Sequence, residues 1–146
     1  MNISFLGNWR KKHGPASGDA VFSGGTAERG GIADLLAECE LLRAQAYEAG
    51  VELDDTAASL EAVDQLVPRW RDDEEILSRL GNDAGLYLGT VVVRTVPGAG
   101  WALWPSGHPV VRLASGREID VVAAGHEWAA SGVPELSRMY AEVAEG

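Results

Sequence analysis

A helical repeat of apolar residues opens the patterned part of the chain, between Ile32 and Ala49. The apolar positions recur every third or fourth residue, at Ile32, Leu35, Leu36, Cys39, Leu42 and Ala46. This spacing places their side chains on one face of an α-helix, and Gly50 provides a C-terminal stop. The sequence therefore predicts one continuous helix over residues 32–49, with Cys39 as a small buried hydrophobe in its apolar stripe.

A second helix is expected after residues 54–56, Asp-Asp-Thr, whose side chains can cap its first turn. Its buried face would carry Leu60, Val63, Val67 and Trp70. Pro68 should end or kink this helix near Val67, because proline lacks the backbone N–H that a helix interior needs. Four acids follow at residues 72–75. We interpret them as charges at the start of another helix, where the helix dipole favours anions, and not as a metal site.

Residues 80–96 fit two kinds of secondary structure. Their many β-branched side chains favour a strand, whereas their apolar spacing also fits a helix. The helical face would consist of Ala84, Tyr87, Leu88, Val91 and Thr95. Gly85 and Gly89, four residues apart, would then allow a neighbouring helix to approach closely. We expect a helix, in part because of a family resemblance described below.

From Gly98 onward the pattern is typical of short antiparallel strands. Strands are expected at residues 101–104, 110–113 and 118–122, with turns at 105–107 and 114–117. Alternation assigns six residues to the core face of the sheet: Trp101, Leu103, Val111, Leu113, Ile119 and Val121. The opposite face would carry Trp104, Arg112 and Asp120.

A final helix is expected from about Pro134, since proline is favoured in the first turn of a helix. Its buried side would hold Leu136, Met139 or Tyr140, and Val143. Together these elements predict an α+β fold in which several helices pack on one face of a small antiparallel sheet, with a flexible N-terminal tail. We assign residues 32–146 to a single α+β domain.

The first 31 residues differ from this domain in composition. Residues 1–13 contain an apolar patch and then a basic run: Ile3, Phe5, Leu6 and Trp9, then Arg10, Lys11 and Lys12. Residues 14–31 contain six glycines, which is typical of a flexible linker. Phe5 and Trp9 are candidate binding residues, which could pack on their own domain, enter a groove on a partner or contact a membrane surface weakly. We favour a protein contact, because an anionic membrane would repel the acidic remainder of the chain.

Composition and charge narrow the classes of function. The 146 residues are 46% hydrophobic, which is enough for one core, and no run of 18 apolar residues could span a membrane. The first 13 residues carry +3, and the whole chain carries −10, so the remainder carries −13. A body this acidic repels phosphate backbones, which argues against nucleic acid as a partner.

Cysteine content and the N-terminal pattern bear on the compartment. Cys39 is the single cysteine, so no internal disulfide can form. The N-terminus lacks the apolar stretch and the small-residue cleavage site of a secretory signal peptide. We therefore expect a cytoplasmic protein.

The familiar catalytic signatures are each broken at a specific residue. His126 and Glu127 begin like a zinc-protease helix, but Ala130 stands where a second metal-binding histidine is needed. The stretch Gly98-Ala99-Gly100 begins like a dinucleotide-binding loop, yet Leu103 replaces its third glycine. The chain also contains neither a P-loop lysine nor a serine in a G-x-S-x-G context. The sequence therefore predicts no metal site and no cofactor.

Two hypotheses about function remain. In the first, the chain is a non-catalytic cytoplasmic interaction or regulatory module. It would bind a protein partner through its acidic body and a sheet face that carries Trp104, His108 and Arg112. Trp104 has two interpretations, an interface anchor or an aromatic ring that covers the edge of the core.

The alternative is a small hydrolase or metal-dependent enzyme that uses His126, Glu127 and Asp120, since histidine and carboxylate serve both acid–base chemistry and metal binding. Such chemistry needs groups that converge on one point. The spacing of these three residues does not force them to converge, so we favour the interaction module.

One block of the sequence resembles a known type of domain. It runs from Leu80-Gly81 through residues 84–89, Ala-Gly-Leu-Tyr-Leu-Gly, to Gly100-Trp101, and continues at 109–113 and 116–120. In residues 32–130 the chain is similar to a group of uncharacterised small bacterial domains common in actinobacteria. The resemblance implies a helix with a G-x-Y-x-G core, then a glycine and a tryptophan that open a small antiparallel sheet. Some similar domains look like immunity-type or accessory binding proteins, which favours a non-catalytic role.

Overall fold

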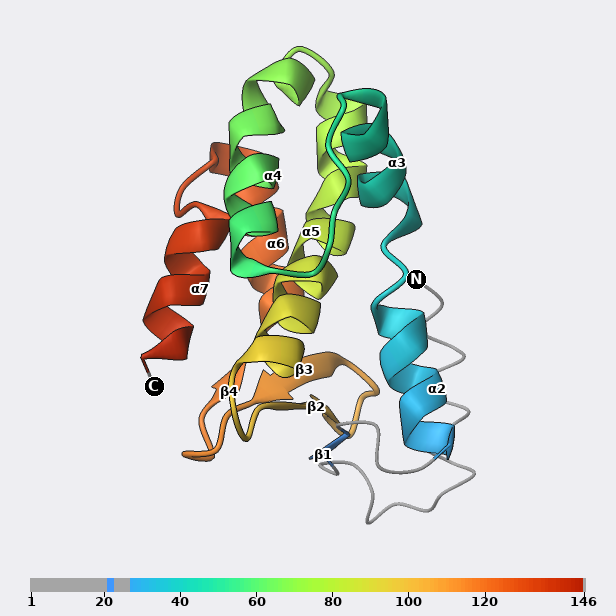
Figure 1. Cartoon of the computed structure of the whole chain (residues 1–146), viewed down its shortest axis with the longest axis vertical. Helices are drawn as coiled ribbons and strands as arrows, with labels where there is room; N and C mark the ends of the chain where they lie inside the picture. The colour runs from blue at the N-terminus through green and yellow to red at the C-terminus, as the bar shows by residue number, and fades with distance from the viewer. Residues whose placement is uncertain (1–20, 23–26, 146) are drawn as a thin grey trace.

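The computed structural model describes residues 21–22 and 27–145. In chain order its elements are β1 (Val21–Phe22), α2 (Ala27–Leu36), α3 (Glu40–Glu48), α4 (Ala57–Trp70), α5 (Glu74–Thr95), β2 (Gly100–Leu103), β3 (Pro109–Arg112), β4 (Glu118–Ile119), α6 (Val121–Ser131) and α7 (Leu136–Ala144). The helices gather on one side of a four-stranded sheet (Figure 1). The predicted α+β fold is confirmed. None of the described helices is long and apolar enough to cross a membrane.

Helix α5 is the central element, and the acids before it explain where it starts. The Asp73 carboxylate accepts a hydrogen bond from the Ile76 amide at 3.1 Å and so caps the helix, while two glutamates occupy the first turn. The acidic run is therefore part of a helix start, as predicted. The helix continues to Thr95, which confirms the helical interpretation of residues 80–96.

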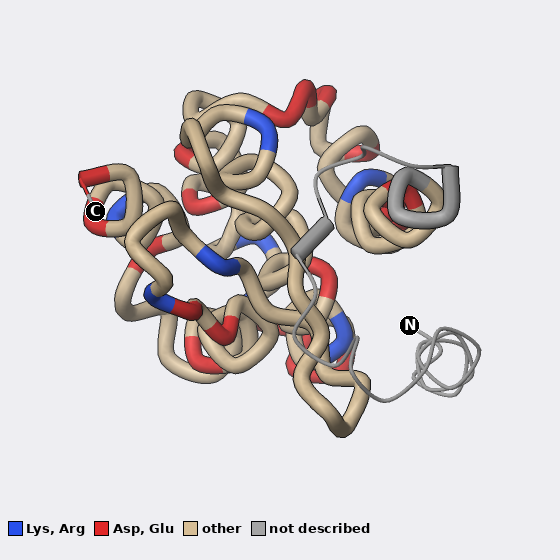
Figure 2. Tube along the Cα trace, turned by 90° about the horizontal axis from the view of Figure 1, so that it is seen from below, with Lys and Arg blue, Asp and Glu red and all other residues tan. Residues whose placement is uncertain are grey.

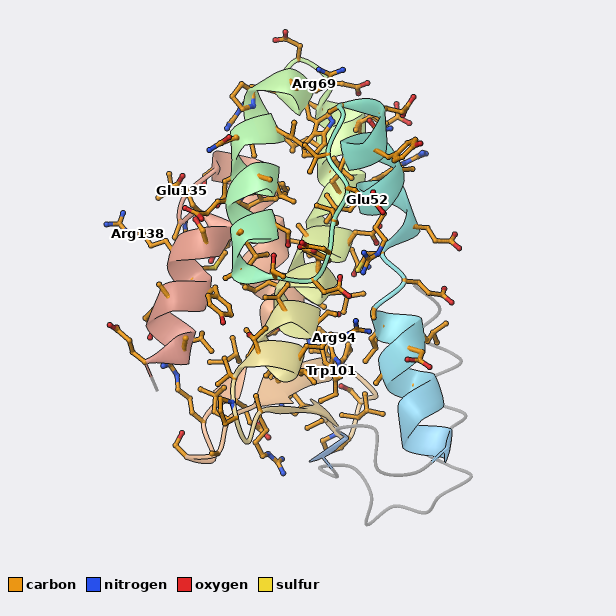
Figure 3. The ribbon with its side chains drawn as sticks, in the orientation of Figure 1. Glu52, Arg69, Arg94, Trp101, Glu135 and Arg138 are labelled. Atoms are coloured by element: carbon orange, nitrogen blue, oxygen red, sulfur yellow. The ribbon has the colours of Figure 1, made fainter. Side chains whose placement is uncertain are left out.

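Glycines bring α5 and α6 into backbone contact. A Cβ atom on Gly85 would collide with the Val121 carbonyl oxygen, and a Cβ atom on Gly125 would collide with the backbone of α5. Gly89, one turn further along α5, receives the indole ring of Trp101, which lies between the sheet and the lower end of α5 (Figure 3). The close helix approach predicted at these two glycines is confirmed at Gly85, whereas at Gly89 the close neighbour is the Trp101 ring and not a helix.

The helix predicted over residues 32–49 is wrong in one respect, because the structure divides it at Cys39. This residue has a left-handed backbone with φ of 43°. Arg43 donates to two carbonyl oxygens at the end of α2, at 2.9 and 3.0 Å, and Asp83 on α5 accepts from the Leu42 amide at 3.1 Å. These contacts satisfy the backbone groups that the break frees. Cys39 is nevertheless buried, as predicted.

Helix α4 begins where predicted but runs past its proline. The Thr56 hydroxyl accepts a hydrogen bond from the Ser59 amide at 3.3 Å, so Thr56 is the N-cap. Pro68 lies inside the helix, which continues to Trp70. Of the two expected effects of Pro68, an end or a kink near Val67, the end is therefore wrong. Val67 and Trp70 are both buried, and their packing offsets the backbone hydrogen bond that proline removes.

Helix α7 is fixed by a carboxylate from another helix. Asp64 on α4 accepts hydrogen bonds from the Leu136 amide at 2.9 Å and from the Ser137 amide and hydroxyl at 3.0 and 2.7 Å. It also accepts from Trp128 Nε1 on α6 at 3.0 Å. Asp64 therefore caps α7 from outside and joins three helices. Leu136 and Val143 are buried on α7, as predicted.

The sheet has the strand order β1-β2-β3-β4, with antiparallel neighbours. Trp101, Leu103 and Val111 pack into the core beneath the helices, as predicted. β1 lies within residues 14–31, and α2 also begins there, at Ala27. The expectation of an irregular linker up to residue 31 is corrected accordingly, because pairing with β2 and helix formation both start earlier.

The strand predicted over residues 118–122 is too long. β4 ends at Ile119, and α6 begins at Val121. The Asp120 carboxylate accepts a hydrogen bond from the Ala123 amide at 3.1 Å and caps α6, which favours a helix start over a longer edge strand. Asp120 therefore does not lie on the sheet face to which alternation assigned it. Val121 is buried as predicted, but it belongs to a helix and not to a strand.

Candidate interaction surface at the sheet

A tight turn places Trp104 and His108 side by side after β2. The Gly107 amide donates to the Trp104 carbonyl at 2.7 Å, and the Trp104 amide donates to the His108 carbonyl at 3.0 Å. Gly107 has φ of +88°, a conformation that glycine adopts without steric cost. The indole and imidazole rings stand 5.3 Å apart between centroids, with 35° between their planes. The two aromatic side chains therefore form one partly exposed unit.

Glu118 on β4 joins Trp104 to Arg112. Its Oε1 accepts from Trp104 Nε1 at 3.0 Å, and its Oε2 accepts from Arg112 Nε at 3.1 Å and also from Arg112 Nη2. The hydrogen bonds from Arg112 and then from Trp104 lower the pKa of Glu118, so its carboxylate is ionised at neutral pH. Sequence reasoning missed Glu118. The predicted turn at 114–117 places Glu118 opposite Arg112 on the neighbouring strand. This pairing of an acid with a base could have identified Glu118 from the sequence.

Asp120 binds His108 from the start of α6. Its Oδ1 lies 2.8 Å from His108 Nε2, while the same oxygen accepts from the Ala123 amide. We call Trp104, His108, Arg112, Glu118 and Asp120 the sheet cluster. The structure thus brings together the three predicted binding residues that it describes. Phe5 and Trp9, the other two, lie outside the described residues.

The residues of the enzyme alternative do not converge in the structure. His126 and Glu127 are exposed on α6, further along the helix than Asp120, whose carboxylate is engaged by His108. A cavity of about 250 Å³ beside His126 is lined by residues of the α4–α5 connection, α5 and α6. Within the described part of the chain, no group of three or more His, Cys, Asp or Glu side chains could hold a metal ion.

A second polar group lies inside the helical layer. The Tyr87 hydroxyl accepts from the Asp55 amide at 2.8 Å and lies 2.6 Å from the Ser59 hydroxyl. Asp55 also pairs with Arg43 at 2.8 Å and with Arg94 at 2.6 Å, and the Arg43 guanidinium lies 5.2 Å from the centre of the Tyr87 ring. These groups satisfy one another and connect α3, α4 and α5, so they stabilise the fold.

Cys39 has no environment that would activate its thiol. Burial, and then the nearby Asp83 carboxylate, raise the pKa of Cys39 to about 12. The thiolate is the nucleophilic form of cysteine, and it is absent at neutral pH when the pKa is this high. Cys39 is a buried hydrophobe, as the sequence predicts.

With this geometry in place, comparison with known proteins identifies the family. The model of a family of unknown function, DUF6278, matches residues 1–146. The chain belongs to the DUF6278 family. This agrees with the resemblance to uncharacterised small domains noted from the sequence. Neither a curated protein nor a solved structure matches this DUF6278 member.

Proposed function

We propose that this DUF6278 protein is a non-catalytic interaction or regulatory module and that the sheet cluster binds a protein partner. The observation that carries the proposal is the convergence of Trp104, His108 and Arg112 on two carboxylates. Tryptophan and arginine supply much of the binding energy at protein interfaces. In the sheet cluster both are held by hydrogen bonds before binding, which reduces the side-chain entropy lost on association.

The exposure of the sheet cluster supports the same role. The side chains of Arg112, His108 and Asp120 retain 24%, 29% and 33% of their accessible surface. They are ordered by internal hydrogen bonds and still reach solvent. A partner could bury their remaining surface without reorganising the sheet.

Charge indicates the kind of partner. The chain carries −10, and Figure 2, which is seen from below, shows Asp and Glu positions on several of its helices. An acidic protein attracts a basic surface, and this attraction mainly raises the association rate at low salt. We propose a basic protein partner. If the chain is an immunity-type domain, its role would be to bind and neutralise such a basic partner.

The test compares partner recovery by full-length variants. Trp104→Ala and Arg112→Ala remove the two anchors, and Tyr47→Ala is the matched control because Tyr47 is 73% exposed on α3, away from the sheet. We expect at least one co-purifying protein whose recovery falls about tenfold or more with the first two variants, equivalent to about 1.4 kcal/mol. Equal recovery of every protein by all three folded variants would contradict the proposal.

One observation favours a second candidate function, that of an enzyme. His108 oriented by Asp120 at 2.8 Å is the arrangement of a general base held by a carboxylate. In the alternative, a small hydrolase or metal-dependent enzyme that uses His126, Glu127 and Asp120, this observation supports Asp120 alone, since His126 and Glu127 lie further along α6. Metal analysis of the purified chain separates the two proposals. A stoichiometric metal that is lost in His126→Ala would favour the enzyme.

We also propose a cytoplasmic location. Support comes from the single cysteine, which is buried and protonated and so needs no oxidising compartment. Fractionation of the source cells, with detection of the native chain, tests this. Recovery in a membrane or extracellular fraction would overturn it.

A further inference from the structure

A cavity of about 250 Å³ lies between the start of α5 and the end of α6, beside the α4–α5 connection. That connection is at the end of the molecule away from the sheet, so the cavity is separate from the sheet cluster (Figure 1). Cavities that hold drug-sized ligands measure roughly 300–1,000 Å³. This cavity therefore fits a smaller molecule.

Hydrogen-bond donors line one part of the cavity. Arg71 comes from the α4–α5 connection and His126 from α6, and glycines leave the space that both occupy. A Cβ atom on Gly132 would lie 2.7 Å from Arg71 Nη2, and a Cβ atom on Gly81 would lie 2.9 Å from His126 Nδ1. Among the residues that the structure describes, neither side chain has a hydrogen-bond or ion-pair partner, and the same is true of the Ser78 hydroxyl, which also lines the cavity. These donors are suited to a carboxylate.

Hydrogen-bond acceptors line the same cavity. Glu74, in the first turn of α5, contributes a carboxylate that no described residue pairs. Ala129 and Ala130 belong to the last turn of α6, where carbonyl groups lack partners within the helix. Pro134 has no N–H to offer, and the Val133 amide donates to a serine hydroxyl at 3.3 Å instead. The carboxylate and the negative end of the helix dipole are suited to an ammonium group.

The charges in the cavity favour a ligand that carries both signs. A simple anion would be attracted by Arg71 and repelled by Glu74, and the reverse holds for a simple cation. A zwitterion satisfies both groups at once, and a ligand with one charge leaves a like charge beside it. Leu77 and Ala129 are buried and add an apolar wall for a short side chain.

We propose that this cavity binds a free α-amino acid with a short apolar side chain. Its carboxylate contacts Arg71 and His126, and its ammonium group contacts Glu74 and the end of α6. The site is distinct from the sheet cluster and does not depend on the proposed function, so the two can fail separately.

The test titrates the full chain with L-alanine and follows the amide NMR signals of Ser78 and Ala130. Propionate and ethylamine are the matched ligands, because each keeps only one of the two charges. We expect saturable shifts with L-alanine at millimolar concentration, and binding that is about tenfold weaker or more with either matched ligand.

Two variants test the two halves of the site. Arg71→Gln and Glu74→Gln each remove one charge from an exposed side chain, and both should weaken L-alanine binding about tenfold or more. Glu74→Gln should strengthen propionate binding, and Arg71→Gln should strengthen ethylamine binding, because the repelling charge is removed. Arg69→Gln is the matched control, since it makes the same change of charge at the end of α4 but outside the cavity (Figure 3).

Three results would overturn the proposal. The first is the absence of saturable shifts at Ser78 and Ala130 with L-alanine. The second is equal affinity for L-alanine and propionate, which would indicate a site for simple anions. The third is equal L-alanine binding by Arg71→Gln and Arg69→Gln. Selectivity for L-alanine that Arg71→Gln abolishes and Arg69→Gln retains supports an amino-acid site.

Discussion

Gly85 stands where a single added carbon would meet the Val121 carbonyl oxygen of α6. We expect Gly85→Ala to destabilise the protein by about 1–3 kcal/mol or more, the usual cost of overpacking, because backbone cannot move aside as a flexible side chain can. Gly31→Ala is the matched control, since Gly31 is exposed in α2 with open space around it. It should gain about 0.5–1 kcal/mol. Urea unfolding of both variants measures the difference, and equal midpoints would contradict the close contact.

Because Cys39 is buried, the free energy of unfolding should depend on pH in the alkaline range. Its pKa is about 12 in the folded chain, against an ordinary value of 9.0. The unfolded chain therefore loses the thiol proton first, so the contribution of Cys39 is complete below pH 9 and declines as the pH rises toward 12. We expect the urea midpoint to fall between pH 9 and 11, and to fall less steeply in Cys39→Ala. An identical slope in both chains would show that another group is responsible.

At the scale of elements, Asp64 holds α7 in place. Asp64→Asn removes the charge and puts an amide group among four donors, so we expect a loss of about 1–3 kcal/mol. Amide exchange at Leu136 and Ser137 should accelerate before the rest of the chain opens. Glu61→Gln is the control on the same helix, because Glu61 is exposed. Unchanged exchange at both amides in Asp64→Asn would exclude the capping role.

At the scale of helices and strands, the pattern of apolar and polar residues predicts some features of the fold and misses others. The spacing of apolar and glycine positions at residues 80–96 fits a helix, but their β-branched side chains also fit a strand, and the family resemblance decided between the two. The pattern does not predict the break at Cys39, since Arg43 and Asp83 stabilise it from outside the pattern. The pattern assigns only the first two residues of α6, 121–122, to a strand, because the helix start there depends on one cap, Asp120, at the end of an apolar strand-like run.

The candidate site was predictable to a similar extent. Alternation placed Trp104 and Arg112 on the same face, and both belong to the sheet cluster. The link between them was not found, because Glu118 acts through side-chain hydrogen bonds that a polar–apolar pattern does not contain. Asp120 belongs to the cluster for a different reason. It caps α6, a helix that the pattern did not predict, and from there it contacts His108.

For the whole molecule, the net charge of −10 governs the response to salt. Repulsion among like charges destabilises a compact state, and salt screens it. We expect the melting temperature at neutral pH to rise as sodium chloride is increased from a few millimolar to physiological strength. Near pH 4.6, where the net charge is close to zero, the increase should vanish. A melting temperature that falls with salt at neutral pH would mean that specific ion pairs outweigh the overall repulsion.

The contact between α5 and α6 has a consequence for how the sequence can change. β2, β3 and β4 all lie between these two helices in the chain, so the sheet is a loop whose two ends are joined by glycine-mediated packing. Closing a loop costs only slightly more as the loop lengthens. Insertions and substitutions in its turns, such as residues 105–107 and 114–117, can therefore alter the sheet cluster while the helical layer stays intact. The family could acquire new partners by varying this loop alone.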